Sequence, residues 1–243
     1  MKQGLFIALV LVLAFVIGWI IFEFFLPDYI KAGGPLVIVL IAFSVMVITF
    51  TIERMFALNT AKGRGSVTVF LRKVQQEINS GNIDAAIATC DKQRGTPANV
   101  LRAGLEKYKV LKASGATKSA KETMEEMQRA IEESMMLEVP LLEKNLVFLS
   151  TLASIATLTG LLGTTLGMIR AFNALAKSGA PDAVALSLGI SEALVNTAGG
   201  LFTAIMGIVF YNYFATRIDN FTYMIDEATY TMVTTLAEKD SSK

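Results

Sequence analysis

The sequence NLVFLSTLASIATLTGLLGTTLGMI occupies residues 145–169 and contains no charged side chain. A second charge-free stretch, ALVNTAGGLFTAIMGIVFYNYFAT, occupies residues 193–216. A helix needs about 20 apolar residues to cross a bilayer, so each stretch is long enough to be a transmembrane helix. Residues 4–22 and 32–52 are also free of charge, which brings the predicted number of spans to four.

The composition of the 243-residue chain agrees with this prediction. Hydrophobic residues make up 53% and charged residues only 18%, whereas soluble domains carry about a quarter charged residues. No strand pattern is present, so we predict an all-α integral membrane protein. The absence of histidine and the single Cys90 exclude histidine relays and intramolecular disulfides. Without a nucleotide-binding loop, we expect neither an enzyme nor a cofactor, and no nucleic-acid partner.

The distribution of basic residues predicts the topology. Residues 53–144 hold fifteen of the 22 lysines and arginines, and basic residues near membrane spans mark the cytoplasmic side. The connections at residues 27–34 and 174–182 hold one lysine each, Lys31 and Lys177, and fit the opposite side. Four spans then place both termini in the cytoplasm of a multi-pass protein.

The first hydrophobic block has two interpretations. A lysine followed by an apolar run also describes a secretory signal peptide, whose apolar part is about 7 to 15 residues long. The run here extends to residue 22, and no small-residue cleavage pattern follows it directly. Its length favours a retained anchor helix, and cleavage stays the alternative.

The region between the second and third predicted spans has helical periodicity throughout. Ser66, Asn82 and Thr96 each stand where a helix is expected to start. We expect Pro140 to kink the last of these helices near the membrane, and the fourth span to continue as a helix past Arg217. The predicted parts are an N-terminal anchor helix (1–26), a short periplasmic loop and second span (27–52), a cytoplasmic helical domain (53–144), two motif spans (145–216), and a C-terminal cytoplasmic helix and tail (217–243).

The last two spans are rich in small and polar residues. Helices in lipid associate through small residues and interhelical hydrogen bonds. Candidate packing positions at helical spacing are Gly160, Gly163, Gly167, Gly200, Ala204 and Gly207. Beside them lie the hydroxyls of Thr157 and Thr164 on the third span, and Glu192, Asn196 and Thr197 on the fourth. These polar groups can line an ion path, or they can serve packing and bond their own backbone.

Titratable groups are scarce in these two spans. Arg170 and Glu192 both lie near the outer end, and none lies at mid-depth. Ionisable groups inside a membrane mark ion and proton pathways, so a hydroxyl-lined path without one predicts that another polypeptide supplies the titrating group. Hydroxyls can serve a proton or a sodium ion, and the sequence does not choose between them.

Two motifs in consecutive spans carry a family resemblance. GLLGTTLGM at residues 160–168 and SEALVNTAGGL at residues 191–201 resemble the ExbB and TolQ members of the MotA/TolQ/ExbB proton-channel family. The resemblance extends over roughly residues 35–225 and favours ExbB over MotA. It departs from the family pattern at Thr157, where many members have proline, at Asn196, which is often small and apolar, and in the additional first span.

The resemblance implies a motor subunit of a bacterial inner-membrane complex. Such subunits form a pentamer around a dimer of an ExbD-like single-span partner, whose membrane aspartate carries protons, and the complex energises a TonB-like protein. It assigns pathway roles to Thr164, Thr197 and Glu192. A TolQ-like role, a flagellar stator of the MotA type and a non-conducting membrane scaffold are the alternatives.

The predicted cytoplasmic part also sorts its charges. Seven glutamates outnumber four basic residues between positions 113 and 145, among them Glu125, Glu126, Glu132 and Glu133. In a ring of subunits these four would form an acidic vestibule that concentrates cations. Alternatively, they are ordinary solvated positions on helix faces.

Overall fold

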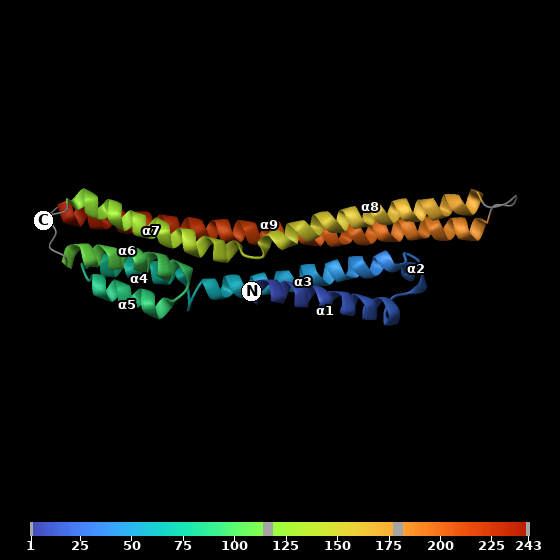
Figure 1. Cartoon of the computed structure of the whole chain (residues 1–243). Coiled ribbons are helices and arrows are strands. Elements are labelled where there is room, and N and C mark those ends of the chain that lie inside the picture. The colour runs from blue at the N-terminus through green and yellow to red at the C-terminus, as the bar shows by residue number, and fades with distance from the viewer. Residues whose placement is uncertain (1, 114–118, 177–181, 242–243) are drawn as a thin grey trace. The chain divides into compact units, whose positions relative to one another are not determined.

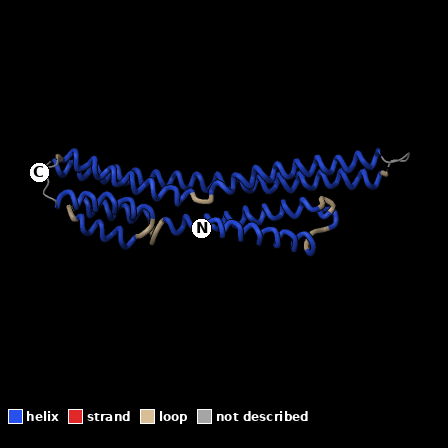
Figure 2. The backbone as a smooth tube through the Cα atoms, in the orientation of Figure 1, coloured by secondary structure: helices blue, strands red, loops and turns tan. Residues whose placement is uncertain are grey.

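The computed structural model describes residues 2–113, 119–176 and 182–241, and every element in these ranges is a helix (Figures 1 and 2). The helices are α1 (Lys2–Phe24), α2 (Asp28–Lys31), α3 (Pro35–Ala61), α4 (Val67–Asn79), α5 (Ile83–Gln93), α6 (Thr96–Ala113), α7 (Ala120–Glu143), α8 (Leu146–Ala176) and α9 (Ala183–Ser241). The predicted all-helical fold is therefore confirmed. Lys177 lies outside the described residues.

Within the described residues, four helical stretches are long and apolar enough to cross a membrane. They are Ile7–Phe24, Pro35–Ala61, Lys121–Ala176, which contains α7 and α8, and Ala183–Ser241. The last two stretches contain the third and fourth charge-free blocks in full, and the first two begin three residues after the start of the first and second blocks. The helix of the last block continues past Arg217 for more than twenty residues, as predicted.

The helices form two compact units. The first contains Met1–Arg54 and Asn145–Phe214, and the second contains Met55–Lys144 and Ala215–Lys243. The long helices α3 and α9 each contribute residues to both units.

In the first unit, α1 packs against α3 along one narrow line. Val10, Ala14 and Gly18 are its buried positions, and a methyl group at Gly18 would lie 2.9 Å from the carbonyl oxygen of Ile38. The other described side chains of α1 are mostly exposed, which suits contact with lipid.

Helix α3 is more deeply packed than its sequence suggests. Its leucine-, isoleucine- and valine-rich composition predicts lipid contact, yet Ala42, Val47 and Phe50 are fully buried. The ring of Phe50 stacks on that of Phe148 of α8, with centroids 5.2 Å apart. Composition alone cannot distinguish a lipid-facing helix from a buried one, because both surroundings are apolar.

The second unit packs α4 to α7 with the last part of α9. Each helix contributes one apolar stripe, including Ile78, Leu105, Met127 and Met232, all fully buried. Helices α6, α7 and α9 meet at Gly104, where a methyl group would lie 2.8 Å from Ile131 and 3.0 Å from Met232. A larger residue at this position would therefore have to displace the side chains of Ile131 and Met232.

The start of α7 follows sequence rules, whereas its end does not. Ser119 and Glu122 form a capping box, in which each side chain accepts a hydrogen bond from the other residue's backbone. Helix α7 then continues through Pro140 to Glu143. The helix is interrupted at Lys144 and at Asn145, which has a φ of 64°. Asparagine tolerates this left-handed conformation better than most residues. The helix is therefore interrupted four and five residues after Pro140, and not at the proline itself.

Candidate functional site

The candidate site lies along the seam between α8 and the first part of α9, which run side by side (Figure 1). A methyl group at Gly163 would lie 2.3 Å from the Cβ of Asn196, and one at Gly167 would lie 2.7 Å from the carbonyl oxygen of Gly189. Similar close contacts occur at Gly160, Gly200 and Gly207, and Ala204 is buried. The two backbones therefore approach as closely as glycine allows.

Two threonine hydroxyls of α8 donate hydrogen bonds within their own helix. Thr157 is exposed and donates to the carbonyl of Ala153, 3.0 Å away, while the half-buried Thr164 donates to Leu161 O, 2.6 Å away. Such bonds to the preceding turn are common for threonine in helices. Each oxygen keeps lone pairs for a further partner.

Thr197 occupies a different position, within the seam itself. Its hydroxyl lies 3.2 Å from Ala193 O of its own helix and 3.4 Å from Gly160 O of α8. No hydrogen bond joins Thr164 and Thr197 within the described part of the chain. The two predicted pathway threonines therefore differ in their hydrogen bonds, because Thr164 donates within α8 and Thr197 lies within reach of both α9 and α8.

Asn196 is fully buried and connects α9 to the turn before α3. Its Nδ2 donates to Gly33 O at 2.8 Å and to Glu192 O at 3.0 Å. Its Oδ1 is buried without a hydrogen-bond partner among the described residues. The amide thus fixes the turn against α9 and keeps one free acceptor.

Glu192 and Arg170 form an ion pair between α9 and α8. Only 7% of Glu192 is exposed, while the Arg170 side chain is 58% exposed. Their nearness to the same end of two spans is visible in the sequence, but their pairing depends on the rotation of the helices. The buried carboxylate therefore takes its compensation from a cation that reaches the surface.

Sequence reasoning missed a hydroxyl pair at a different interface. Ser44 of α3 and Thr203 of α9 lie 2.6 Å apart, and Thr203 is buried. Ser44 is a rare polar residue within the second charge-free block, which is the signal that could have identified it. The side chains of Glu192, Asn196 and Thr203 on α9 thus all bond other segments of the same chain.

The four glutamates of the predicted vestibule differ in their contacts. Glu126 pairs with Lys107 of α6 at 2.9 Å, and Glu132 accepts a hydrogen bond from Gln128 at 3.2 Å. Glu125 lies 3.9 Å from Lys121, and Glu133 is exposed. Glu126 therefore serves the packing of α7 on α6. Among the described residues, no three potential metal-binding side chains come together.

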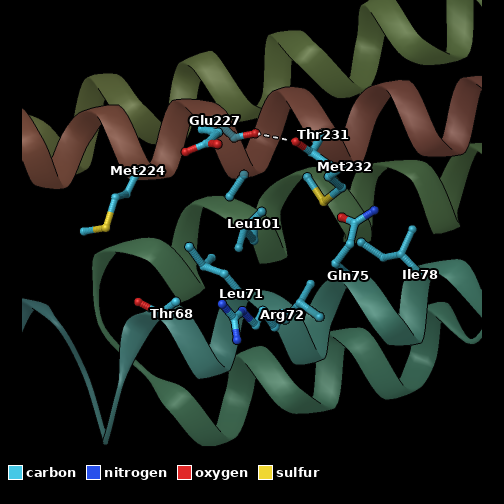
Figure 3. Close-up of a pocket in the computed structure, with 12 residues that line it drawn as sticks. Thr68, Leu71, Arg72, Gln75, Ile78, Leu101, Met224, Glu227, Thr231 and Met232 are labelled. Carbon is cyan, nitrogen blue, oxygen red and sulfur yellow. Dashed lines mark hydrogen bonds between the residues drawn. The ribbon is translucent and has the colours of Figure 1, made fainter.

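The second unit contains an amphipathic cavity of about 260 Å³ between α4, α6 and α9 (Figure 3). Leu71, Leu101 and Met232 line its apolar part, and Arg72 and Glu227 line its polar part. The hydroxyl of Thr231 donates to the backbone carbonyl of Glu227 and not to its carboxylate.

Comparison with known proteins gives consistent matches. The profile described as the MotA/TolQ/ExbB proton channel family matches residues 92–227. A biopolymer transport protein of Synechocystis sp., ExbB-like 3, is 32% identical over 185 residues, which are 75% of this chain and 81% of that protein. The Tol-Pal system protein TolQ of Haemophilus influenzae is 42% identical over 93 residues, 37% of this chain and 40% of TolQ. The biopolymer transport protein ExbB of Salmonella typhimurium is 36% identical over 74 residues, 30% of each chain.

Proposed function

Because the chain belongs to the MotA/TolQ/ExbB proton channel family, we propose that it is the channel subunit of an ion-driven motor in a bacterial inner membrane. In this proposal, five copies surround a dimer of an ExbD-like single-span protein, whose membrane aspartate takes up and releases the proton. The motor energises a TonB-like protein for transport across an outer membrane. Both termini and residues 53–144 lie in the cytoplasm.

The observation that supports this proposal most directly is the surface of α8. Thr157 and Thr164 leave their hydroxyls available on a helix whose spanning part contains no charge. A hydroxyl can donate and accept, as a proton or sodium path requires, but it cannot change charge near neutral pH. The titrating carboxylate must therefore come from the partner. We assign protons as the ion on the family relationship.

The residues of the seam have supporting roles in the proposal. Thr197 reaches across to α8, and Asn196 holds the outer turn with one acceptor free. Glu192 is the acidic group at the outer end of the path, paired with Arg170. The proton's passage down the electrical gradient releases about 2.3 kcal/mol per 100 mV, which is enough to bias a motor whose states differ by a few kcal/mol. Glu125, Glu132 and Glu133 would attract cations to the inner end.

The test replaces Thr164 and Thr197 by valine, which keeps the shape of each side chain and removes its hydroxyl. Thr165→Val is the matched control, because its hydroxyl bonds the backbone three residues earlier at 2.7 Å, as Thr164 does at 2.6 Å. We expect the double variant to assemble with its partner but to lose most proton flux in reconstituted vesicles and most energised uptake. Normal flux and uptake in the double variant would contradict the pathway and favour a scaffold.

A TolQ-like role in the cell envelope is the second candidate. It is favoured by the 42% identity to the Haemophilus influenzae TolQ over 93 residues. The two roles differ in the single-span partner. Identification of the co-purifying partner, and complementation of strains lacking either system, would decide between them.

A further inference from the structure

A second cavity of the second unit, of about 560 Å³, lies where the end of α3, the start of α6 and the end of α7 meet. Its walls are chemically divided. Arg64 and Arg94 stand at its polar side, and Ala57, Leu58 and Leu141 form its apolar side. None of these residues belongs to the proposed ion path.

Two loops that are distant in sequence join to build the polar side. The backbone N–H of Arg64 donates to Gln93 O at 2.7 Å, and the buried Gln93 side chain donates to Lys62 O at 3.1 Å. A methyl group at Gly63 would lie 1.7 Å from the carbonyl oxygen of Arg94. Glycine at position 63 thus lets the loops touch backbone to backbone, which places both arginines at one cavity.

Arg94 has a backbone conformation that is unusual for its residue type. Its φ is 55° and its ψ is 165°, a region in which residues other than glycine are strained. Strained residues of this kind cluster at binding and catalytic sites. A glycine would fit this backbone without strain. The presence of arginine at this position therefore points to a role for its side chain.

The charges of the cavity leave both guanidinium groups available. Arg64 and Arg94 are exposed and form no ion pair with any residue that the structure describes. Glu138 also lines the cavity, but its two carboxylate oxygens accept from Thr96 at 2.8 Å and Asn99 at 2.7 Å. The cavity therefore offers two free cations against one carboxylate that is already hydrogen-bonded.

The apolar side follows closely on the second predicted membrane span. The charge-free block of α3 ends at residue 52, and Leu58 follows on the same helix, about 9 Å further along at 1.5 Å per residue. The polar interfacial layer on each side of a bilayer is about 5 to 8 Å thick, so Leu58 lies near the outer boundary of that layer. Large apolar side chains remain exposed beside the cavity, with Phe56 at 65% and Leu141 at 60%.

We propose that this cavity binds one anionic phospholipid, with Arg64 and Arg94 on its phosphate and the apolar wall along the start of its acyl chains. Arginine suits this role because its planar fork binds phosphate through paired hydrogen bonds. The proposal depends on α3 crossing the membrane and is independent of ion conduction.

The experiment titrates the purified full-length protein in detergent with dioleoylphosphatidylglycerol or dioleoylphosphatidylcholine and counts bound lipids by native mass spectrometry. Wild type should bind the anionic lipid several-fold better than the zwitterionic one. Arg64→Gln combined with Arg94→Gln should lower binding of the anionic lipid at least fivefold. Lys73→Gln combined with Arg129→Gln removes the same charge from exposed positions away from the cavity and should bind as wild type does. Equal binding of the anionic lipid by the two double variants would overturn the proposal.

Arg94→Gly separates binding from folding. It removes the guanidinium while relieving the strained φ, so its thermal midpoint should equal or exceed that of wild type as lipid binding falls. Unchanged binding by Arg94→Gly and by Arg64→Gln would overturn the site. Inorganic phosphate is added in two further arms, one without lipid and one in competition with the bound anionic lipid. If millimolar phosphate raised the thermal midpoint as much as the anionic lipid and displaced it, the ligand would be free phosphate and the lipid assignment would be wrong.

Discussion

Asn196 donates a hydrogen bond to the backbone carbonyl of Gly33, 2.8 Å away and 163 positions earlier in the chain. The bond joins α9 to the turn between α2 and α3 in an environment where Asn196 has no exposed surface. Asn196 also stands against Gly163 of α8. One side chain therefore connects three segments of the first unit.

Asn196→Ala should destabilise the protein by about 1 kcal/mol, because hydrogen bonds between membrane helices contribute about 0.6 kcal/mol on average and up to about 1.7 kcal/mol. Asn212→Ala is the matched control, since Asn212 is an exposed position on the same helix. Thermal unfolding in detergent measures both. Equal midpoints for the two variants would show that the Gly33 bond does not contribute to stability.

Gly163→Ala should separate α8 from α9. The added methyl would lie 2.3 Å from Asn196 Cβ, far inside contact distance, and overpacking of this kind costs about 1 to 3 kcal/mol. Gly199→Ala is the comparison, because its methyl would meet only the side chain of Leu40, at 3.2 Å, and that side chain can move. We expect a lower thermal midpoint and weaker assembly for Gly163→Ala alone. If Gly163→Ala left the thermal midpoint and assembly unchanged, close contact at Gly163 would not be what holds α8 against α9.

Much of the fold follows from the sequence by simple physics. Charge-free blocks of about 20 residues predicted the helical spans, and Ser66, Asn82 and Thr96 correctly indicated where helices of the second unit begin. These signals are local, because a cap or an apolar period acts within one or two turns. The end of α7 was less predictable, since Asn145 takes a left-handed conformation that the residue tolerates but does not require.

The candidate site was less accessible to sequence reasoning. The periodicity of α8 placed its glycines and hydroxyls on neighbouring faces, but it could not say which polar groups meet another helix. Asn196 bonding to Gly33, and Thr203 lying against Ser44, depend on how three helices are rotated about their axes. The rotation of each helix about its axis is set by packing over the whole unit, so no single sequence motif predicts it.

The Arg170–Glu192 pair should respond asymmetrically to substitution. Arg170→Gln leaves a carboxylate that is 7% exposed without its cation, and an uncompensated buried charge costs about 3 kcal/mol or more. Glu192→Gln leaves only the 58% exposed Arg170, which water solvates, so we expect a loss of about 1 kcal/mol or less. The double variant should be more stable than Arg170→Gln alone. Equal losses from the two single variants, measured by thermal unfolding, would contradict this.

Tyr108 should make the second unit sensitive to alkaline pH. Burial raises the pKa of Tyr108 to about 12, and the hydrogen bond that its hydroxyl donates to Asp240, at 3.0 Å, acts in the same direction. The unfolded tyrosine releases its proton near pH 10, so between pH 10 and 12 the unfolded state binds fewer protons than the folded state. Stability therefore falls as pH rises through this window, by up to about 2 kcal/mol. Tyr108→Phe should abolish this part of the pH dependence, whereas Tyr223→Phe, at a 69% exposed position, should retain it. Denaturant unfolding at pH 9 and pH 11.5 measures the difference, and parallel losses in wild type and Tyr108→Phe would assign the alkaline sensitivity to other groups.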